Sequence, residues 1–502
     1  MLCRPTTGNF SPAFYLFIAV IFAASLSACS DSDDVNGATN QSEEDCTPDQ
    51  TWNPIDNVCV TIGGEEDAGP VADADGEEDT GGNGGDECGG GPGTTITGTV
   101  TIPSGELPLP DVTVYVPATD PDPISSGATC EPCDDALSGN PITETLTGIN
   151  GRFSLTQAPS GDEVPLVIEV GKWRRQVTLE NVEPCQEYEI TDLDKTRLPR
   201  NQEEGNIPQF GVSTGGCDAL GCLLRKIGID ESEFTPEDED GRVHLFAGRD
   251  GTTRYDNSLN DGASLTPAWN WWDDLDNLLD YDIVALSCEC NNNGGDKSND
   301  ARQALQDFTE AGGRAFLSHL QYIWLSEGTD DFQSVADWAT GMAPATGQVE
   351  DGIIDTSFPK GQDLREWMYQ TGTTPAGEFP IHETRGSIES INEDIATQWV
   401  WIESEGMDFE FPGFEDFFPD PPPELVQYFS FNTPIAAHPN DQCGRLVFSD
   451  IHVASGQQSS PDHPFPTGCT DEELTPQEKA LVFMLFDLAR CIIPDKGDLA
   501  GR

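Results

Sequence analysis

The side chains of this 502-residue chain that could do chemistry follow three short apolar runs in its C-terminal half. Each run has the length and aliphatic composition of a buried parallel strand. Parallel strands end at one edge of their sheet, which is where open α/β sheets bind ligands. A thiol, hydroxyl or imidazole at that edge could act as a nucleophile or a base. The candidates are Cys288 and Cys290 after the first run, Ser318 and His319 at the end of the second, and Asp450 and His452 in the third.

The same residues also have a structural interpretation without chemistry. Strand-end histidines such as His319 and His452 often only form hydrogen bonds, and Cys288 could be buried or oxidised. A disulfide between Cys288 and Cys290 would be strained, which favours other partners. Ser318 lacks the flanking glycines of a hydrolase elbow. The six histidines of the chain show neither the HxH nor the HExxH spacing, so we predict no metal site and no cofactor.

An alternation of strands and helices must position these side chains, which indicates an α/β domain. One helix is expected to be capped by Asn299 and ended by Gly312-Gly313. The closing helix carries a capping box made by Thr475 and Glu478. The α/β domain would span 241–502, with strands at 243–247, 282–287, 314–318 and 445–453, after a connector at 196–240 with a helix over 218–227.

Residues 340–430 form a long insertion between the second and third runs. Its segment 408–423 mixes Phe, Pro and acidic residues, and Trp399 and Trp401 lie close by. Folded over the strand ends, the insertion could be a lid or a binding surface for a sugar or peptide. Packed against the sheet, it would be an excursion whose aromatic residues fill a satellite core, which is the interpretation we favour.

Two stretches of the α/β region, Tyr281–Leu286 and Ala311–His319, resemble the class I glutamine-amidotransferase-like superfamily, and in particular its trehalose-utilisation (ThuA-like) branch. The resemblance implies a flavodoxin-like fold. It also implies a nucleophilic cysteine in a Gly-x-Cys-x-Gly elbow, but the elbow position here reads Leu317-Ser318-His319-Leu320. Cys288 follows the preceding strand and does not substitute directly. We therefore expect the fold without the family's nucleophile.

Residues 94–195 consist of short stretches rich in β-branched residues, with a tight-turn signal at Asn150-Gly151. This pattern predicts an antiparallel β-sandwich. The stretch resembles the carboxypeptidase regulatory-like family, which implies a transthyretin-like sandwich without peptidase chemistry. A CxxC loop, Cys130 to Cys133, indicates an insert disulfide that could involve Cys185. The residues that carry the resemblance are Gly98-Thr99-Val100, Leu109–Val114, Asn150–Phe153 and Gly171-Lys172-Trp173.

The N-terminus has the pattern of a secretory leader. An apolar run over 13–24 is short for a membrane span and suits a signal-peptide core. It leads to Leu26-Ser27-Ala28-Cys29, which resembles the lipobox of bacterial lipoproteins. The resemblance implies removal of residues 1–28 and a lipid anchor on Cys29, and Ser30 in the next position resembles an outer-membrane address. The alternative is an ordinary signal peptide with a chance cysteine.

Charge and composition predict a disordered, extended tether over 29–93. No Lys or Arg lies between Arg4 and Arg152, and the segment is rich in Gly, Asp and Glu. The whole chain has 90 acidic and 24 basic residues, a formal net charge of -66, which excludes nucleic acid as a partner. Within the tether, Cys46 and Cys59 enclose a short loop that reads as a disulfide staple.

The 15 cysteines favour an oxidising compartment. If Cys3 is removed with the leader and Cys29 carries the lipid, 15 less 2 leaves 13, so at least one is unpaired or joins another chain. Proximity in the sequence favours the pairs Cys46–Cys59 and Cys443–Cys469.

The sequence therefore leads to two hypotheses for a multidomain envelope protein. In the first, the chain is a non-catalytic binding or structural surface lipoprotein with a carbohydrate or protein ligand. In the second, it is an envelope hydrolase of a carbohydrate or amide that uses His319, Asp450 and His452 beneath the insertion. An open cleft that joins these side chains would favour the hydrolase.

Overall fold

The computed structural model describes residues 50–53, 58–61, 88, 93–130, 136–342, 349–373, 377–404, 424–452, 459–493 and 495. The chain divides into two compact units, 1–81 and 82–502. In the first unit, β1 (Gln50–Asn53) and β2 (Val58–Thr61) form an antiparallel ribbon with Trp52 opposite Cys59. Cys29, Cys46 and the leader lie outside the described residues, so the anchor and the Cys46–Cys59 staple stay predictions.

Two small sheets open the second unit. Exposed and buried residues alternate along β6, whereas most of β4 is buried. Ile96, Val114, Phe153 and Ile168 from both sheets share one core. The four-stranded sheet has the order β5 (Pro141–Leu146), β4 (Thr113–Pro117), β7 (Gly161–Val170), β8 (Trp173–Val182). The three-stranded sheet has the order β6 (Arg152–Leu155), β3 (Thr95–Thr99), β9 (Glu187–Glu189).

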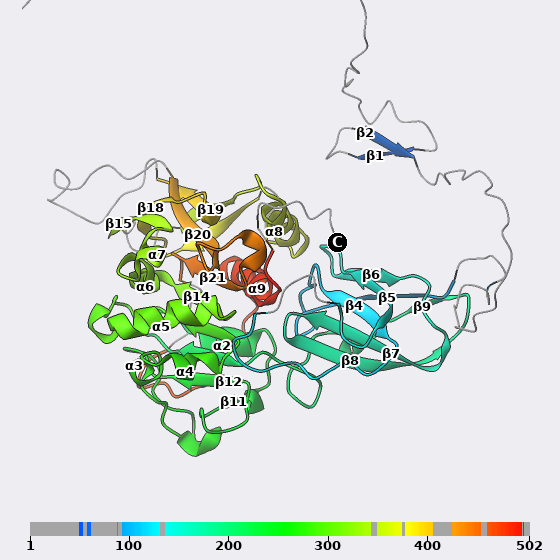
Figure 1. Ribbon diagram of the computed structural model, residues 1–502, viewed down its shortest axis with the longest axis horizontal. Coiled ribbons are helices and arrows are strands. Elements are labelled where there is room, and N and C mark those ends of the chain that lie inside the picture. The colour runs from blue at the N-terminus through cyan, green and yellow to red at the C-terminus, as the bar shows by residue number, and fades with distance from the viewer. Residues whose placement is uncertain are drawn as a thin grey trace, which may run out of the picture. The chain divides into compact units, whose positions relative to one another are not determined.

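A ten-stranded sheet dominates the remainder of the unit, and its first six strands are parallel (Figure 1). From β10 the chain runs outward to the edge strand β11 and returns through β12, which lies beside β10. It then crosses to β13 on the other side of β10, so the strand order reverses between β10 and β13. The six strands, in sheet order, are β11 (Phe234–Thr235), β12 (Val243–Phe246), β10 (Phe210–Ser213), β13 (Ile283–Leu286), β14 (Arg314–Ser318) and β21 (Gly444–Ser449).

Successive residues of these strands enter two different cores, as the period of two requires. Ile283 and Ala285 of β13 belong to one core, and Val284 and Leu286 belong to the other. The first core also holds side chains of α2 (Leu220–Lys226), α8 (Pro359–Gln370) and α9 (Pro476–Ala489). The second holds side chains of α3 (Ala268–Trp271), α4 (Leu275–Leu279), α5 (Asn299–Glu310), α6 (Ile323–Ser326) and α7 (Asp330–Gln333).

Local sequence signals determine where the helices α5 and α9 begin. The capping box of α9 is present, since Thr475 accepts from the Glu478 amide and Glu478 accepts from the Thr475 amide. The cap of α5 is Ser298, whose hydroxyl accepts from the amide of Ala301, and not Asn299 as expected. The expectation was wrong by one residue because both Ser and Asn are good caps.

Part of the insertion belongs to the large sheet. Its strands extend the sheet in antiparallel fashion beyond β21, and Trp399 is fully buried, which agrees with a packed excursion. Residues 405–423, with the whole Phe-rich segment 408–423, lie outside the described residues. The added strands are β20 (Glu424–Thr433), β19 (Ala396–Glu403), β16 (Val349–Ile354) and β17 (Glu378–His382), and β15 (Ala336–Met342) pairs separately with β18 (Gly386–Ile391).

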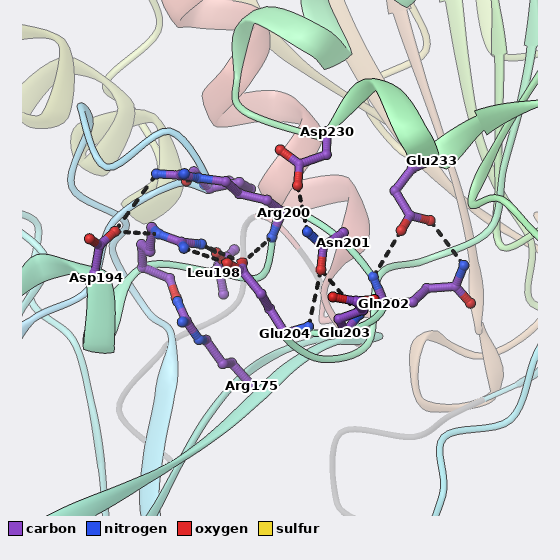
Figure 2. Close-up of polar contacts among 12 residues, drawn as sticks. Arg175, Asp194, Leu198, Arg200, Asn201, Gln202, Glu203, Glu204, Asp230 and Glu233 are labelled. Carbon is purple, nitrogen blue, oxygen red and sulfur yellow. Dashed lines mark hydrogen bonds and ion pairs between the residues drawn. The ribbon is translucent and has the colours of Figure 1, made fainter. Parts of the chain in front are cut away.

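A polar network organises the connector around α1 (Leu193–Thr196), as Figure 2 shows. The buried Arg197 guanidinium donates to both carboxylate oxygens of Glu204 at 2.5 and 2.6 Å and to Asp194 at 2.9 Å. Glu204 also accepts from the Arg200 amide, and the Arg197 guanidinium holds the pKa of Glu204 down to about 2. Arg175 donates to the Arg197 carbonyl, so the network joins β8 to the connector.

The described cysteines pair over long distances in the sequence. The expected pair Cys443–Cys469 is wrong, because Cys443 precedes β21 and bonds to Cys130, whereas Cys469 follows β21 and bonds to Cys222. The expected partners of Cys130 and Cys185 within the sandwich insert are also wrong. The disulfides are Cys88–Cys185, Cys130–Cys443, Cys217–Cys290 and Cys222–Cys469, and Cys491 is also disulfide-bonded. Among the described residues Cys288 is the free cysteine, which agrees with the odd count.

Candidate functional site

The carboxyl edge of the parallel strands brings together most of the predicted site residues. Cys288 follows β13, Ser318 ends β14 and His452 follows β21, and hydrogen bonds of the parallel ladder hold β14 beside both of its neighbours. All of these side chains are buried or nearly so. The site is therefore a buried cluster in the described part of the chain.

Cys288 and His319 form the centre of this cluster. The Cys288 sulfur lies 3.4 Å from Nδ1 of His319. Burial raises the pKa of the Cys288 thiol to about 12, and the negative charge of Asp218 adds to the shift. Burial also lowers the pKa of His319 well below its ordinary value, and His452 and Arg385 reinforce this direction. Both groups are therefore neutral at pH 7.

His319 occupies a strained backbone position at the end of β14. Its φ of 48° lies in the left-handed region, which costs a residue with a side chain about 1–3 kcal/mol. The side-chain Nε2 of Gln321 donates to the Ser287 carbonyl at 2.6 Å and ties this turn to the end of the strand before Cys288. The chain thus makes a strained turn after β14, although the flanking glycines of an elbow are missing, and the strained residue is a histidine.

His452 lies against His319 and toward a carboxylate. The two imidazole centroids are 3.9 Å apart with the planes 36° apart. Nδ1 of His452 lies 3.0 Å from the Cys217 carbonyl oxygen and 3.6 Å from Oδ1 of Asp218. Although burial opposes the charged form, Asp218 raises the pKa of His452 above its ordinary value. Because a carbonyl oxygen can only accept, Nδ1 carries a proton.

Asp218 is the residue that sequence reasoning missed. It is 2% exposed, and it accepts a hydrogen bond from the Ser318 hydroxyl. It lies between Ser318 and His452, so the serine proton is directed to a carboxylate and not to an imidazole. The Ser–His–acid order of a hydrolase triad is therefore not formed by these residues. Asp218 follows the unpredicted strand β10, which is why its place at the edge was not foreseen.

Asp450 belongs to a different contact. Its carboxylate accepts from the Ser387 amide at 2.7 Å and from the Ser387 hydroxyl at 2.9 Å. Burial raises the pKa of Asp450 to about 6, against the opposing effect of these hydrogen bonds and of Arg385. Ser387 lies on β18, so Asp450 anchors the insertion to the end of β21.

A small pocket with about 20 Å³ of space, partly open to solvent, lies beside Asp218. Thr214, Leu245 and Ser287, from the ends of β10, β12 and β13, line it together with the Cys222–Cys469 disulfide. These strand ends flank the point where the strand order reverses, which is the expected ligand position of a doubly wound sheet. The buried Ser287 hydroxyl has no hydrogen-bond partner among the described residues.

One group of potential metal ligands is also present. One ligand atom each from Cys217, Cys288 and His452 lie within 4.8 Å of one another. Cys217 is in a disulfide with Cys290, so its sulfur is not a thiolate in this form. No local spacing signalled this group, since its members follow three different strands.

Comparison with known proteins gives no family. No protein-family model and no curated protein matches the chain. A solved type II cohesin–X-dockerin complex from Acetivibrio cellulolyticus, an N-terminal interface mutant, is similar over 27% of this chain and 85% of that chain, at 13% identity and a TM-score of 0.15. Within the described residues, no helix has the length and apolar character needed to span a bilayer.

Proposed function

We propose that the chain is a lipid-anchored envelope protein whose α/β domain binds a ligand or partner without catalysing a reaction. The observation that carries this proposal is the neutral, buried pair Cys288 and His319. A thiol nucleophile works as a thiolate, which a nearby imidazolium stabilises. Here burial opposes both charges, so the ion pair that would activate the thiol is disfavoured.

The strand order supports the proposed relation to amidotransferase-like domains. The order β12-β10-β13-β14-β21 corresponds to the 2-1-3-4-5 order of flavodoxin-like sheets. The strained turn at His319 lies where such a domain would carry its nucleophile, and the side chain there is an imidazole. In the N-terminal part of the second unit, the two facing small sheets support a regulatory-like sandwich.

The pocket beside Asp218 is the binding site we favour. Its lining offers four hydroxyls and a carboxylate, from Thr214, Thr252, Ser287, Ser459 and Asp218. Such groups recognise hydroxyls, and a pocket of about 20 Å³ admits one hydroxyl of a carbohydrate bound over its mouth. The unpartnered Ser287 hydroxyl gains a hydrogen bond when that hydroxyl enters. A bulky residue in place of Ser287 would fill the pocket.

The absence of catalysis is tested with a panel of esters, amides and glycosides. Wild type, Cys288→Ala and His452→Ala should all give background rates, because none contains an activated nucleophile. A rate above background that is lost in His452→Ala would favour the hydrolase alternative. A rate that is lost only in Cys288→Ala would show that the thiol is active despite its burial.

Carbohydrate binding is tested on a glycan array with wild type and Ser287→Leu. We expect a carbohydrate that wild type retains and Ser287→Leu releases, with Thr467→Leu, at an exposed position outside the pocket lining, as the matched control. Equal binding by Ser287→Leu and wild type would exclude this pocket.

Lipid anchoring is tested by palmitate labelling of cells that express wild type or Cys29→Ala. Labelling of wild type alone supports the anchor, and equal labelling of the two contradicts it. Cys3→Ala is the matched control, since a leader cysteine would be removed with the leader.

A further inference from the structure

The cluster formed by Cys217, Cys288 and His452 has the composition of a metal site, and one of its ligands is held in a disulfide. We propose that it is a redox-gated zinc site, which binds Zn²⁺ when the Cys217–Cys290 disulfide is reduced. Two thiolates and one imidazole are a ligand set that Zn²⁺ accepts, with a fourth position left for water or a ligand. This site does not depend on the function proposed above.

The geometry of the three ligand atoms is close to that of a bound site. All lie within 4.8 Å of one another, and ligand atoms about 2.0–2.3 Å from a common tetrahedral zinc lie roughly 3.3–3.8 Å apart. A shift of about 1 Å per side chain would therefore close the site. The carboxyl ends of β10, β13 and β21 hold the three residues, so the sheet supplies a rigid frame.

The surroundings of His452 resemble the outer shell of a zinc ligand. A ligating imidazole commonly donates its other N–H to a carbonyl or carboxylate, which fixes the ring and its tautomer. Nδ1 of His452 donates to the Cys217 carbonyl at 3.0 Å, with Asp218 at 3.6 Å. The neutral ring then carries its lone pair on Nε2, the atom that would bind the metal.

The disulfide acts as the gate. A dithiol reductant breaks the Cys217–Cys290 bond, supplies two electrons and two protons, and becomes a disulfide itself. Cys290 moves out of the cluster, and Zn²⁺ binding releases one proton each from the Cys217 and Cys288 thiols. Cys217 and Cys290 are both partly exposed, whereas Cys288 is fully buried, so a reductant can reach the gate before it reaches Cys288.

Two variants separate the ligand from the disulfide. Cys290→Ser and Cys217→Ser lose the same disulfide, but only Cys290→Ser keeps the proposed ligand Cys217. The full chain is purified without reductant, dialysed against Zn²⁺ with excess Mg²⁺ to occupy surface carboxylates, and analysed for bound metal. We expect about one retained Zn²⁺ per chain in Cys290→Ser, and none above the background of oxidised wild type in Cys217→Ser.

Three results would overturn the proposal. These are equal retention by Cys217→Ser and Cys290→Ser, no retention by a folded Cys290→Ser, or undiminished retention when His452→Ala is added to Cys290→Ser. If Cys290→Ser does not fold, wild type is reduced with a limiting dithiol and the opened cysteines are mapped by alkylation. Zn²⁺ should then protect Cys217 but not Cys290, and equal alkylation of these two cysteines in the presence of Zn²⁺ would contradict the site.

Discussion

The sulfur of Cys288 lies 3.4 Å from Nδ1 of His319, and burial favours the uncharged form of both groups. In a thiol enzyme the same two groups would form a thiolate–imidazolium pair. In this protein burial disfavours both charged forms. The negative charge of Asp218 further disfavours a thiolate at Cys288, and His452 further disfavours an imidazolium at His319.

Alkylation of Cys288 should be slow in the folded protein. With a pKa of about 12, the thiolate fraction at pH 8 is about 10⁻⁴, against about one quarter for an unperturbed thiol. We expect iodoacetamide to react roughly 10³-fold more slowly than in the unfolded chain, with a rate that still rises between pH 8 and 10. Peptide mass spectrometry measures this, and a plateau below pH 9 would contradict the raised pKa.

Asp450 should destabilise the folded protein as the pH rises. Its pKa is about 6 in the folded state and about 3.8 in the unfolded state, so folding favours the protonated carboxyl. The stabilisation is complete below about pH 4 and lost as the pH rises through about 6, with an upper limit of about 3 kcal/mol. Asp450→Asn should gain stability relative to wild type between pH 4 and 7.5.

Urea unfolding at each pH measures the Asp450 effect. Asp441→Asn, which removes a carboxyl at an exposed position, is the control. A constant difference from wild type for Asp450→Asn would show that its pKa is unshifted.

The buried ion pair Lys297–Glu289 should be essential for stability. Its charged atoms are 2.6 Å apart and both side chains are 0% exposed. Lys297→Met leaves the Glu289 carboxylate buried and unpaired, which should cost about 3–5 kcal/mol. Thermal unfolding measures this loss, and adding Glu289→Gln should recover part of it.

The ion pair Arg302–Glu327 provides the exposed comparison, since Glu327 is 58% exposed. Glu327→Gln should cost less than about 1 kcal/mol. Equal losses in Lys297→Met and Glu327→Gln would mean that the Lys297 site is solvated.

Gly171, between β7 and β8, should not tolerate a side chain. Its φ is +52°, and a Cβ would lie 1.8 Å from the carbonyl oxygen of Ala489 at the end of α9. Gly105 has a φ of +87° but open space around the same position. Gly105→Ala should therefore cost about 1–2 kcal/mol from backbone strain alone, and Gly171→Ala clearly more.

Thermal unfolding of both glycine variants, with hydrogen exchange over α9, measures the difference. Faster exchange at the end of α9 is expected in Gly171→Ala only. Similar stability of the two variants would show that α9 moves freely away from the β7–β8 turn.

The sequence by itself determined the elements whose signals are local. The capping box of Thr475 and Glu478 lies within one helical turn. The apolar composition of residues 283–286 is by itself enough to predict a buried strand there. Such signals are reliable because they depend only on residues close in the chain. A capping box consists of hydrogen bonds within one helical turn, and a strand pattern consists of neighbouring side chains on one strand. The strand β10 was missed because Phe210-Gly-Val-Ser213 offers only two apolar residues.

Only the tertiary structure decided which residues meet at the edge of the sheet. Asp218 joins Ser318 across 100 residues, and Cys443 pairs with Cys130 across 313, neither of which sequence spacing indicates. The charge states followed from the same packing, since the pKa values of Cys288 and His319 depend on burial by elements distant in the chain. The residue types therefore defined a set of candidate groups, and packing selected their partners because solvation and contact are properties of the folded state.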